Sequence, residues 1–148
     1  MAAGGNVNRH DRILALDVGT RRIGIAVTDP LGHSAQGLPT LLRISRRKDL
    51  EHIAGIIQQL EIKELVVGLP LRMGGEASAQ TERVKKFVEA MKEVFALPIH
   101  LHDERLTSWE ARAMLSSQKL DRHEMKGRVD KIAACLILQS FLEARKKA

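Results

Sequence analysis

Three acidic positions in this 148-residue chain are the ones best placed to do chemistry. Asp17 interrupts the apolar segment Ile13 to Val18, where burying an unpaired charge would cost several kcal/mol, so this carboxylate needs a partner. Hydrogen bonds from Thr20 or from turn amides would satisfy it, and so would a metal ion. Asp17 alone leaves both interpretations open.

Two further acidic sites favour the metal. Asp103 and Glu104 stand where an expected strand ends, and Asp130 is expected to open the last helix, where the helix dipole favours a negative charge. Two alanines one turn later would let that helix approach a sheet closely. Three carboxylates from separate elements, without a Cys or His cluster beside them, suit Mg²⁺ or Mn²⁺. Such a site predicts phosphodiester hydrolysis, in which the cations activate a water and stabilise the leaving oxygen.

Hydrophobic patterning predicts the elements that must position these acids. Strands are expected at Ile13–Val18, Ile23–Thr28, within Ser34–Leu42, at Glu64–Leu69 and at Pro98–His102. Helices are expected at Ser45–Leu60, Ala77–Phe95, directly after Arg105 at the capping box of Thr107 and Glu110, and finally over Val129–Phe141. The first three strands, on short turns, predict an antiparallel meander. The whole order predicts an α/β fold with helices flanking a mixed five-stranded sheet.

Length and composition predict one domain over residues 12 to 148, preceded by a flexible extension at residues 1 to 11. Lys and Arg number 24 against 18 Asp and Glu, and this excess of +6 favours a polyanionic partner, although a basic surface also aids solubility. Aromatic residues make up only 3%, which argues against a protein that binds single strands by base stacking. Because the start lacks a signal-peptide core and no apolar run could span a bilayer, we expect a cytoplasmic protein with no membrane partner.

Four basic residues are candidate nucleic-acid contacts: Arg21, Arg72, Arg105 and Lys131. Each has a structural alternative. The first would be a solvated turn charge, the second part of an ordinary strand-to-helix connection within a glycine-rich loop, the third a salt bridge that holds the acids, and the fourth one charge on a solvated helix face. His100 and His102 alternate on one strand, but two histidines without a third ligand are weak support for zinc.

Four segments together resemble a known family. They are LALDVGTRRIGIAVTD from Leu14, VVGLPLRMGG from Val66, DERLTSWEA from Asp103 and VDKIAACLILQ from Val129. In this order the chain resembles the YqgF family, also called RuvX, of ribonuclease H-like proteins over nearly its whole length.

The resemblance implies the ribonuclease H-like fold and an acidic triad of Asp17, Glu104 and Asp130 that is catalytic and binds metal. It also implies a cytoplasmic nuclease that matures the 5′ end of precursor 16S ribosomal RNA, with ribosomal precursor particles as partners. An older view of the family implies Holliday junction resolution, for which branched DNA is the substrate and a symmetric dimer is needed. The residues alone do not discriminate between RNA and branched DNA as the substrate, and they are compatible with both a monomer and a homodimer.

One departure from the wider superfamily concerns the second carboxylate. Many such nucleases carry an acid at the tip of the fourth strand, whereas this chain has Gly68-Leu69-Pro70 there. Glu104 must then supply the carboxylate from the next strand, and Asp103 is the alternative because strand parity is uncertain at a strand end.

Two other classes compete with a nuclease. The segment LDVGTRRIGIAV also resembles the first phosphate-binding segment of actin-like kinases and ATPases, but those proteins need two such domains and this chain has room for one. A non-catalytic RNA-binding module would keep the fold without the activity. Acidic residues at all three triad positions argue against that module.

Overall fold

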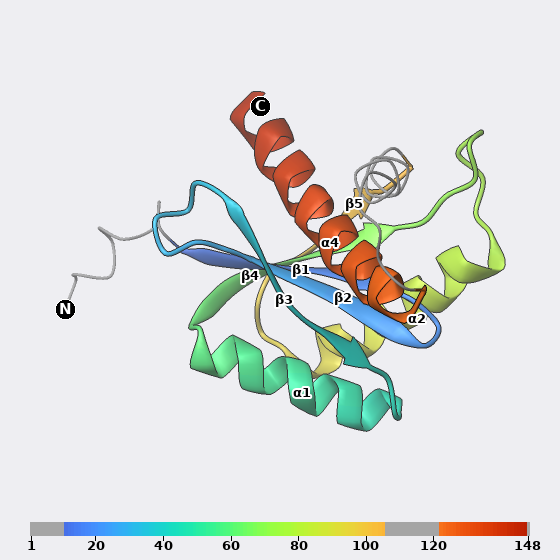
Figure 1. Ribbon diagram of the computed structural model, residues 1–148, viewed down its shortest axis with the longest axis horizontal. Helices are drawn as coiled ribbons and strands as arrows, with labels where there is room; N and C mark the ends of the chain where they lie inside the picture. The colour runs from blue at the N-terminus through green and yellow to red at the C-terminus, as the bar shows by residue number, and fades with distance from the viewer. Residues whose placement is uncertain (1–10, 106–121, 148) are drawn as a thin grey trace.

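The computed structural model describes residues 11–105 and 122–147, and these form an α/β architecture (Figure 1). The elements are β1 Arg12–Val18, β2 Arg22–Thr28, β3 Ala35–Leu42, α1 Arg46–Gln59, β4 Ile62–Leu69, α2 Ala79–Val94, β5 Ile99–Asp103 and α4 Arg122–Lys147. The strands form one sheet in the order β3-β2-β1-β4-β5. β1, β2 and β3 are antiparallel neighbours, and β4 is parallel to both β1 and β5. The predicted meander and the predicted mixed five-stranded sheet are therefore confirmed.

Serine caps begin both helices that follow the meander. The Ser45 hydroxyl accepts a hydrogen bond from the Lys48 amide at 3.2 Å, as the sequence predicted. α2 begins slightly later than expected because Ser78 caps it, in a reciprocal capping box with Thr81. The helix predicted after Arg105, with its capping box, and residues 1–10 of the predicted extension lie outside the described residues.

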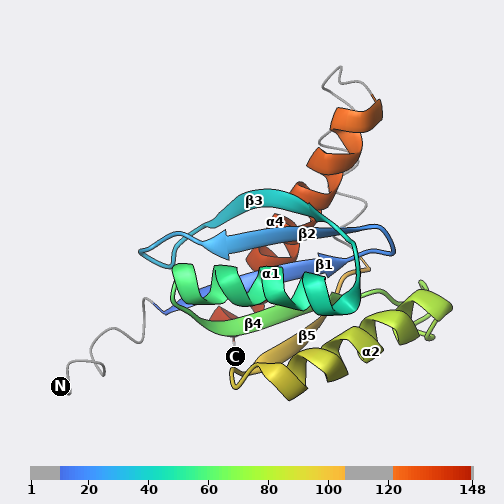
Figure 2. The same ribbon diagram turned by 90° about the horizontal axis from the view of Figure 1, so that it is seen from below.

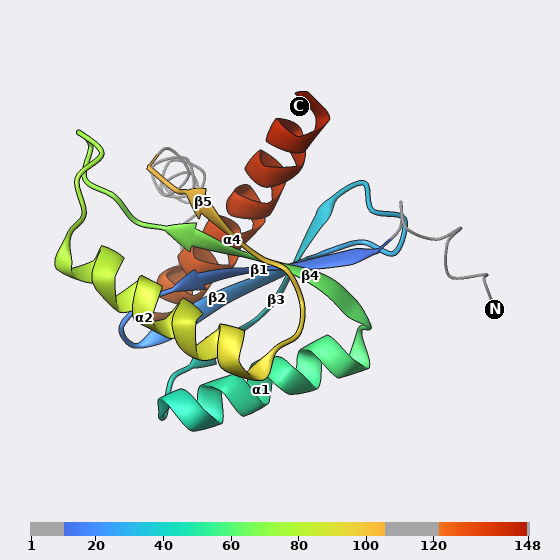
Figure 3. The same ribbon diagram turned by 180° about the vertical axis from the view of Figure 1, so that it is seen from behind.

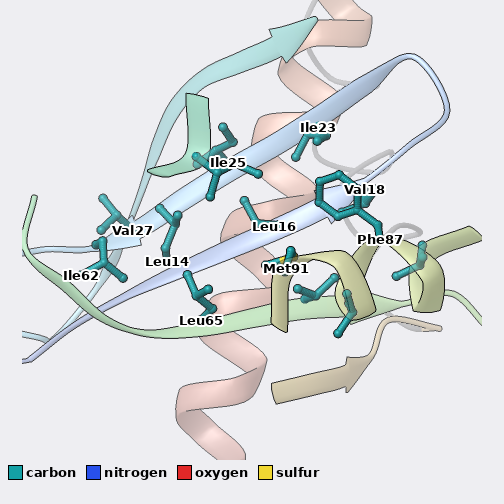
Figure 4. Close-up of a cluster of buried hydrophobic side chains, with 14 residues drawn as sticks. Leu14, Leu16, Val18, Ile23, Ile25, Val27, Ile62, Leu65, Phe87 and Met91 are labelled. Atoms are coloured by element: carbon teal, nitrogen blue, oxygen red, sulfur yellow. The ribbon is translucent and has the colours of Figure 1, made fainter. Parts of the chain in front are cut away.

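Helices cover both faces of the sheet: α1 and α2 lie on one face and α4 lies on the other (Figures 2 and 3). The core between the sheet and α1 and α2 is the larger one, and Figure 4 shows it. Its buried members include Leu14, Leu16, Val18, Ile23, Ile25, Val27, Ile53, Leu65, Phe87 and Met91. The core under α4 is smaller and contains Ile13, Ala15, Ala26, Val66, Ala134, Ile137 and Leu138.

The two cores show which way each side chain of β1 points. Leu14, Leu16 and Val18 face α1 and α2, while Ile13 and Ala15 face α4. Because successive side chains of a strand point to opposite faces, Asp17 belongs to the α4 face. This parity places the acid on the side of the sheet that the last helix covers.

α4 differs from its prediction at its start. The helix begins at Arg122, so Asp130 lies in its interior and not at its first residue. The expectation that the helix dipole stabilises this carboxylate is therefore wrong, because the dipole acts on the first turn. The polar stretch before Val129 hid the first turns of the helix, since it carries no apolar period. α4 has 26 residues, yet no helix among the described residues is both long and apolar enough to cross a membrane.

Close packing of α4 on the sheet depends on a glycine in β2. A Cβ atom added to Gly24 would lie 2.1 Å from the backbone oxygen of Asp130, so no larger residue fits without moving the helix. Ala133 and Ala134 are buried, as expected for a helix that approaches a sheet closely. Because Gly24 also pairs with Asp17 in the β1–β2 register, this contact brings Asp130 to the end of β1.

Candidate active site

Asp17 lies near the carboxyl end of β1, one residue before the strand ends. The adjoining turn is closed by a hydrogen bond from the Gly19 amide to the Arg22 carbonyl oxygen at 2.8 Å. On the other side, the Gln80 side-chain amide donates to the Val18 carbonyl oxygen at 2.9 Å, which ties the first turn of α2 to the same strand end. These contacts fix the backbone at the end of β1, next to Asp17.

Glu104 comes directly after β5 and lies over Gly68 of β4. A Cβ atom added to Gly68 would be 2.2 Å from Glu104 Oε2 and 2.5 Å from Ile137 Cδ1. The space above this glycine is thus filled by the Glu104 carboxylate and by α4. Gly68 belongs to β4, within the predicted strand Glu64–Leu69. The glycine at the tip of the fourth strand is what lets the next strand supply the acid.

Asp17 and Glu104 meet in the space between the sheet and α4, and their carboxyl groups share a hydrogen bond. Burial, together with the charge of Asp17, raises the pKa of Glu104 to about 8. Burial and the charge of Asp130 raise the pKa of Asp17 to about 6. Both shifts favour retention of a proton by the pair as a whole near neutral pH.

Asp130 approaches Asp17 from α4 but is bound to another residue. Arg22, the first residue of β2, places its Nε 2.7 Å from Asp130 Oδ2, and both side chains are partly buried. The guanidinium supplies the compensating charge that the sequence analysis assigned to the helix dipole. This pairing joins positions 108 residues apart, so local patterning carried no signal for it.

Asp103, the alternative second carboxylate, points away from the other acids. Its carboxylate binds Arg105, with Nη2 at 2.6 Å from Oδ2, and this hydrogen bond lowers the pKa of Asp103. Arg105 also donates to the Met73 carbonyl oxygen at 3.2 Å, in the loop between β4 and α2. Arg105 therefore forms the predicted kind of salt bridge, but to Asp103 and not to the triad. Glu104 is the acid that faces Asp17.

The other predicted nucleic-acid contacts are spread around this end of the sheet. Arg21 is exposed on the β1–β2 turn, and Arg72 is exposed in the loop before α2. Lys131 follows Asp130, but its stem lies against β3, where a Cβ on Gly37 would be 2.3 Å from Lys131 Cγ.

The three acids fit a hard divalent cation by their chemistry. They offer only oxygen donors, and two of them are buried carboxyl groups whose pKa values are raised by burial and mutual repulsion, which a dication would relieve. Within residues 11–105 and 122–147, however, no three His, Cys, Asp or Glu side chains converge in a ready-made metal site. Asp130 is held by Arg22, so its carboxylate must be shared with the guanidinium or released from it to serve as a ligand.

The two histidines of β5 have other partners. His100 Nε2 lies 2.6 Å from Glu64 Oε2, and His102 Nε2 lies 2.7 Å from Ser140 Oγ on α4. Both rings pack near Phe141. The bond to Ser140 and the packing on Phe141 join α4 to β5 at the sheet edge.

Comparison with known proteins gives the chain a set of close relatives. The family model described as "RuvX: Holliday junction resolvase" matches residues 11–144. A protein of Koribacter versatilis is 52% identical over 136 residues, covering 92% of this chain and 89% of that protein. A protein of Thermoanaerobacter pseudethanolicus is 46% identical, covering 91% of this chain and 98% of that one. Both carry the name "Putative pre-16S rRNA nuclease".

Solved structures with little sequence similarity share the architecture. T. thermophilus RuvC in complex with a Holliday junction substrate matches with a TM-score of 0.57 at 12% identity, over 94% of this chain and 98% of that chain. The fowlpox virus resolvase in complex with junction DNA matches with a TM-score of 0.54 at 9% identity, over 90% of this chain and 98% of that chain. At such identities the likeness concerns the fold alone.

Proposed function

The chain belongs to the RuvX family and has the expected ribonuclease H-like fold, and from this premise we propose that it is a metal-dependent nuclease acting in 5′-end processing of precursor 16S ribosomal RNA. Two relatives with the pre-16S rRNA nuclease name, each matched over nearly their whole length, support this substrate. The observation that carries the proposal is the meeting of the buried carboxyl groups of Asp17 and Glu104 under α4, with Asp130 beside them.

Asp17, Glu104 and Asp130 are the proposed catalytic residues and the ligands of Mg²⁺ or Mn²⁺. When bound, the cation supplies Lewis acidity that activates a water and stabilises the leaving oxygen. Asp17 and Glu104 must lose their shared proton before both can bind as carboxylates. Arg22 holds the Asp130 carboxylate in place until then.

The nucleic acid is held by basic residues around the acids. Arg21 and Arg72 are exposed and free to meet phosphates, and we assign them to the backbone of the substrate. Arg105 holds the loop before α2 through its hydrogen bond to Met73, and we assign it to substrate binding together with that loop. The aliphatic part of Lys131 packs on β3, and we assign its ammonium group to a phosphate of the substrate. Ribosomal precursor particles in the cytoplasm are then the partners. Residues 12–148 act as one domain, and the proposal is compatible with both a monomer and a homodimer.

The test is cleavage of precursor 16S rRNA fragments with Mn²⁺ by the wild type and by Asp17→Asn. We expect the wild type to cleave and the variant to lose cleavage while keeping its fold and most of its RNA affinity, because the substitution preserves volume and most phosphate contacts lie elsewhere. Circular dichroism and RNA binding in EDTA serve as controls. Normal cleavage by Asp17→Asn would refute the assignment.

A second candidate is resolution of four-way DNA junctions, which the description of the matching family model favours. Resolution requires two strands to be cut in concert, and hence a symmetric dimer. A synthetic four-way junction belongs in the same assay. Cleavage of the junction alone, by a protein that sediments as a dimer, would select this function over RNA processing.

A further inference from the structure

A group of exposed cations begins α1, on the opposite face of the sheet from α4. It consists of Arg46, Arg47 and Lys48, here called the α1 basic cluster, and all three side chains are exposed. Arg47 is 82% exposed and has only a loose contact with Glu51 at 3.8 Å, which contributes little at the surface. Within the described part of the chain, neither Arg46 nor Lys48 forms an ion pair.

The position of the cluster disfavours the helix that carries it. The first turn is the positive end of the helix dipole, where acidic residues stabilise and cations destabilise. Asp49, the one acid in the first turn, is buried and already binds Arg43 and the Ile44 amide. Three neighbouring cations at this end also repel one another. Positions that lower local stability without an evident gain are expected at functional sites. For clustered cations, the function indicated is binding of a polyanion.

Arg43 fixes this cluster to the end of the sheet that carries the acids. Its Nη1 donates to the Gly19 carbonyl oxygen at 2.8 Å, its Nε lies 2.9 Å from Asp49 Oδ2, and its amide donates to the Arg21 carbonyl oxygen at 2.9 Å. The start of α1 is thus braced against the β1–β2 turn. All three overall views agree that the start of α1 lies beside this turn (Figures 1, 2 and 3).

The β1–β2 turn links the cluster to the acids by a short path. Asp17 lies two residues before Gly19, and Arg22, which binds Asp130, lies at the other end of the turn. Arg21 is exposed between them. A strand whose reacting phosphate is at the acids can therefore cross the end of the sheet over Arg21 and continue onto the α1 face.

We propose that the α1 basic cluster binds the phosphodiester backbone of the substrate strand where it leaves the acids across the β1–β2 turn. This inference rests on the proposed nuclease function and adds a second contact surface to it. The contacts are to phosphates and so are independent of base sequence. They give affinity and register and take no part in the chemical step.

The test compares two variants of the full chain that each remove three cations. The first is Arg46→Gln, Arg47→Gln, Lys48→Gln. The matched control is Lys63→Gln, Lys92→Gln, Lys146→Gln, three exposed cations at the start of β4, in the last turn of α2 and near the end of α4. Binding of a precursor 16S rRNA fragment is measured in EDTA as a function of salt, so that nothing is cleaved.

We expect the cluster variant to lose about tenfold or more in affinity at low salt, and its slope of log K against log salt to fall by about 2, since each phosphate contact on a single strand contributes roughly 0.7. The control should lose far less. The midpoint of thermal unfolding should stay unchanged or rise in the cluster variant, because cations leave the positive end of a helix. A loss of RNA binding can then not be ascribed to unfolding.

Equal losses in the two variants would overturn the proposal, because net charge alone would explain them, and so would wild-type binding by the cluster variant. The proposed function fails separately, if the wild type does not cleave RNA with Mn²⁺. If the wild type does not cleave RNA but the cluster variant still loses RNA binding, the α1 basic cluster is an RNA-binding surface and the nuclease proposal alone is refuted.

Discussion

Asp17 and Glu104 hold one proton between two carboxyl groups that a cation would need fully ionised. The proton and the cation therefore compete for the same oxygens. The competition extends up to neutral pH, because the pKa of Glu104 is raised to about 8 by burial and by the charge of Asp17. Binding of the proposed cation would thus be linked to pH through Asp17 and Glu104.

We predict that Mn²⁺ affinity rises with pH between about 6 and 8, by up to about tenfold per unit, and levels off above the pKa of Glu104. Glu104→Gln should bind Mn²⁺ more weakly and with a shallower pH dependence. The electron paramagnetic resonance signal of free Mn²⁺ measures both. Calorimetry in two buffers of different ionisation enthalpy should detect about one proton released per site near pH 7. Affinity independent of pH over this range would contradict the shared proton.

At the scale of elements, the acids are brought together by glycines on the sheet and not by the loops. Gly24 lets α4 come close enough to deliver Asp130, and Gly68 leaves the space that Glu104 fills. Both glycines lie on the α4 face of their strands. The site therefore depends on how tightly one helix packs on one face of the sheet.

Gly24→Ala tests this packing. The added methyl group would lie 2.1 Å from the Asp130 carbonyl oxygen, so α4 must shift, and we expect a loss of about 1–3 kcal/mol in the free energy of unfolding together with weaker Mn²⁺ binding. Gly55→Ala is the control, because nothing lies within 4 Å of its Cβ position in α1, and alanine there should stabilise by up to about 1 kcal/mol. Urea denaturation measures both. Wild-type stability of Gly24→Ala would show that α4 packs less closely.

Most elements were predictable, because apolar runs and serine caps act locally: β1 and α1 differ from expectation by a residue or less at each start. The start of α4 was not predictable, because the first turns of this helix have no periodic pattern of apolar residues. For the site, the sequence suggested Asp17 and Glu104. It could not decide between Glu104 and Asp103, because that decision depends on which face each side chain takes at the end of β5. The pairing of Arg22 with Asp130 is a tertiary contact without a sequence pattern.

The buried carboxyl groups of Asp17 and Glu104 lower the free energy of unfolding of the whole molecule when they are ionised. An acid whose pKa is higher in the folded state than in the unfolded state favours folding at low pH, and this contribution is lost as pH rises through the folded pKa. For Glu104 the two values are 4.5 and about 8. The metal-free protein should therefore lose stability as pH rises across this window. The lowered pKa values of Asp29 and Glu64 have the opposite effect, because the stability that they contribute is lost as pH falls into the acid range.

We predict that Glu104→Gln is more stable than the metal-free wild type at pH 8, by on the order of 1 kcal/mol, and that the difference shrinks toward pH 5. Thermal unfolding in EDTA across this range provides the measurement. Adding Mn²⁺ should stabilise the wild type more than the variant, because only the wild type keeps all three carboxylates. A difference that does not change with pH would mean that Glu104 titrates normally.

The order in which α4 appears has a consequence for the protein during its own synthesis. Translation proceeds from the N-terminus, so the five strands and Glu104 leave the ribosome before Asp130 and the rest of the last helix. Until then α4 does not cover Ala15, Ala26 and Val66, and the third acid is missing. The proposed acidic site is therefore complete only after α4 has been made, so a partly synthesised chain that lacks this helix should not cleave RNA.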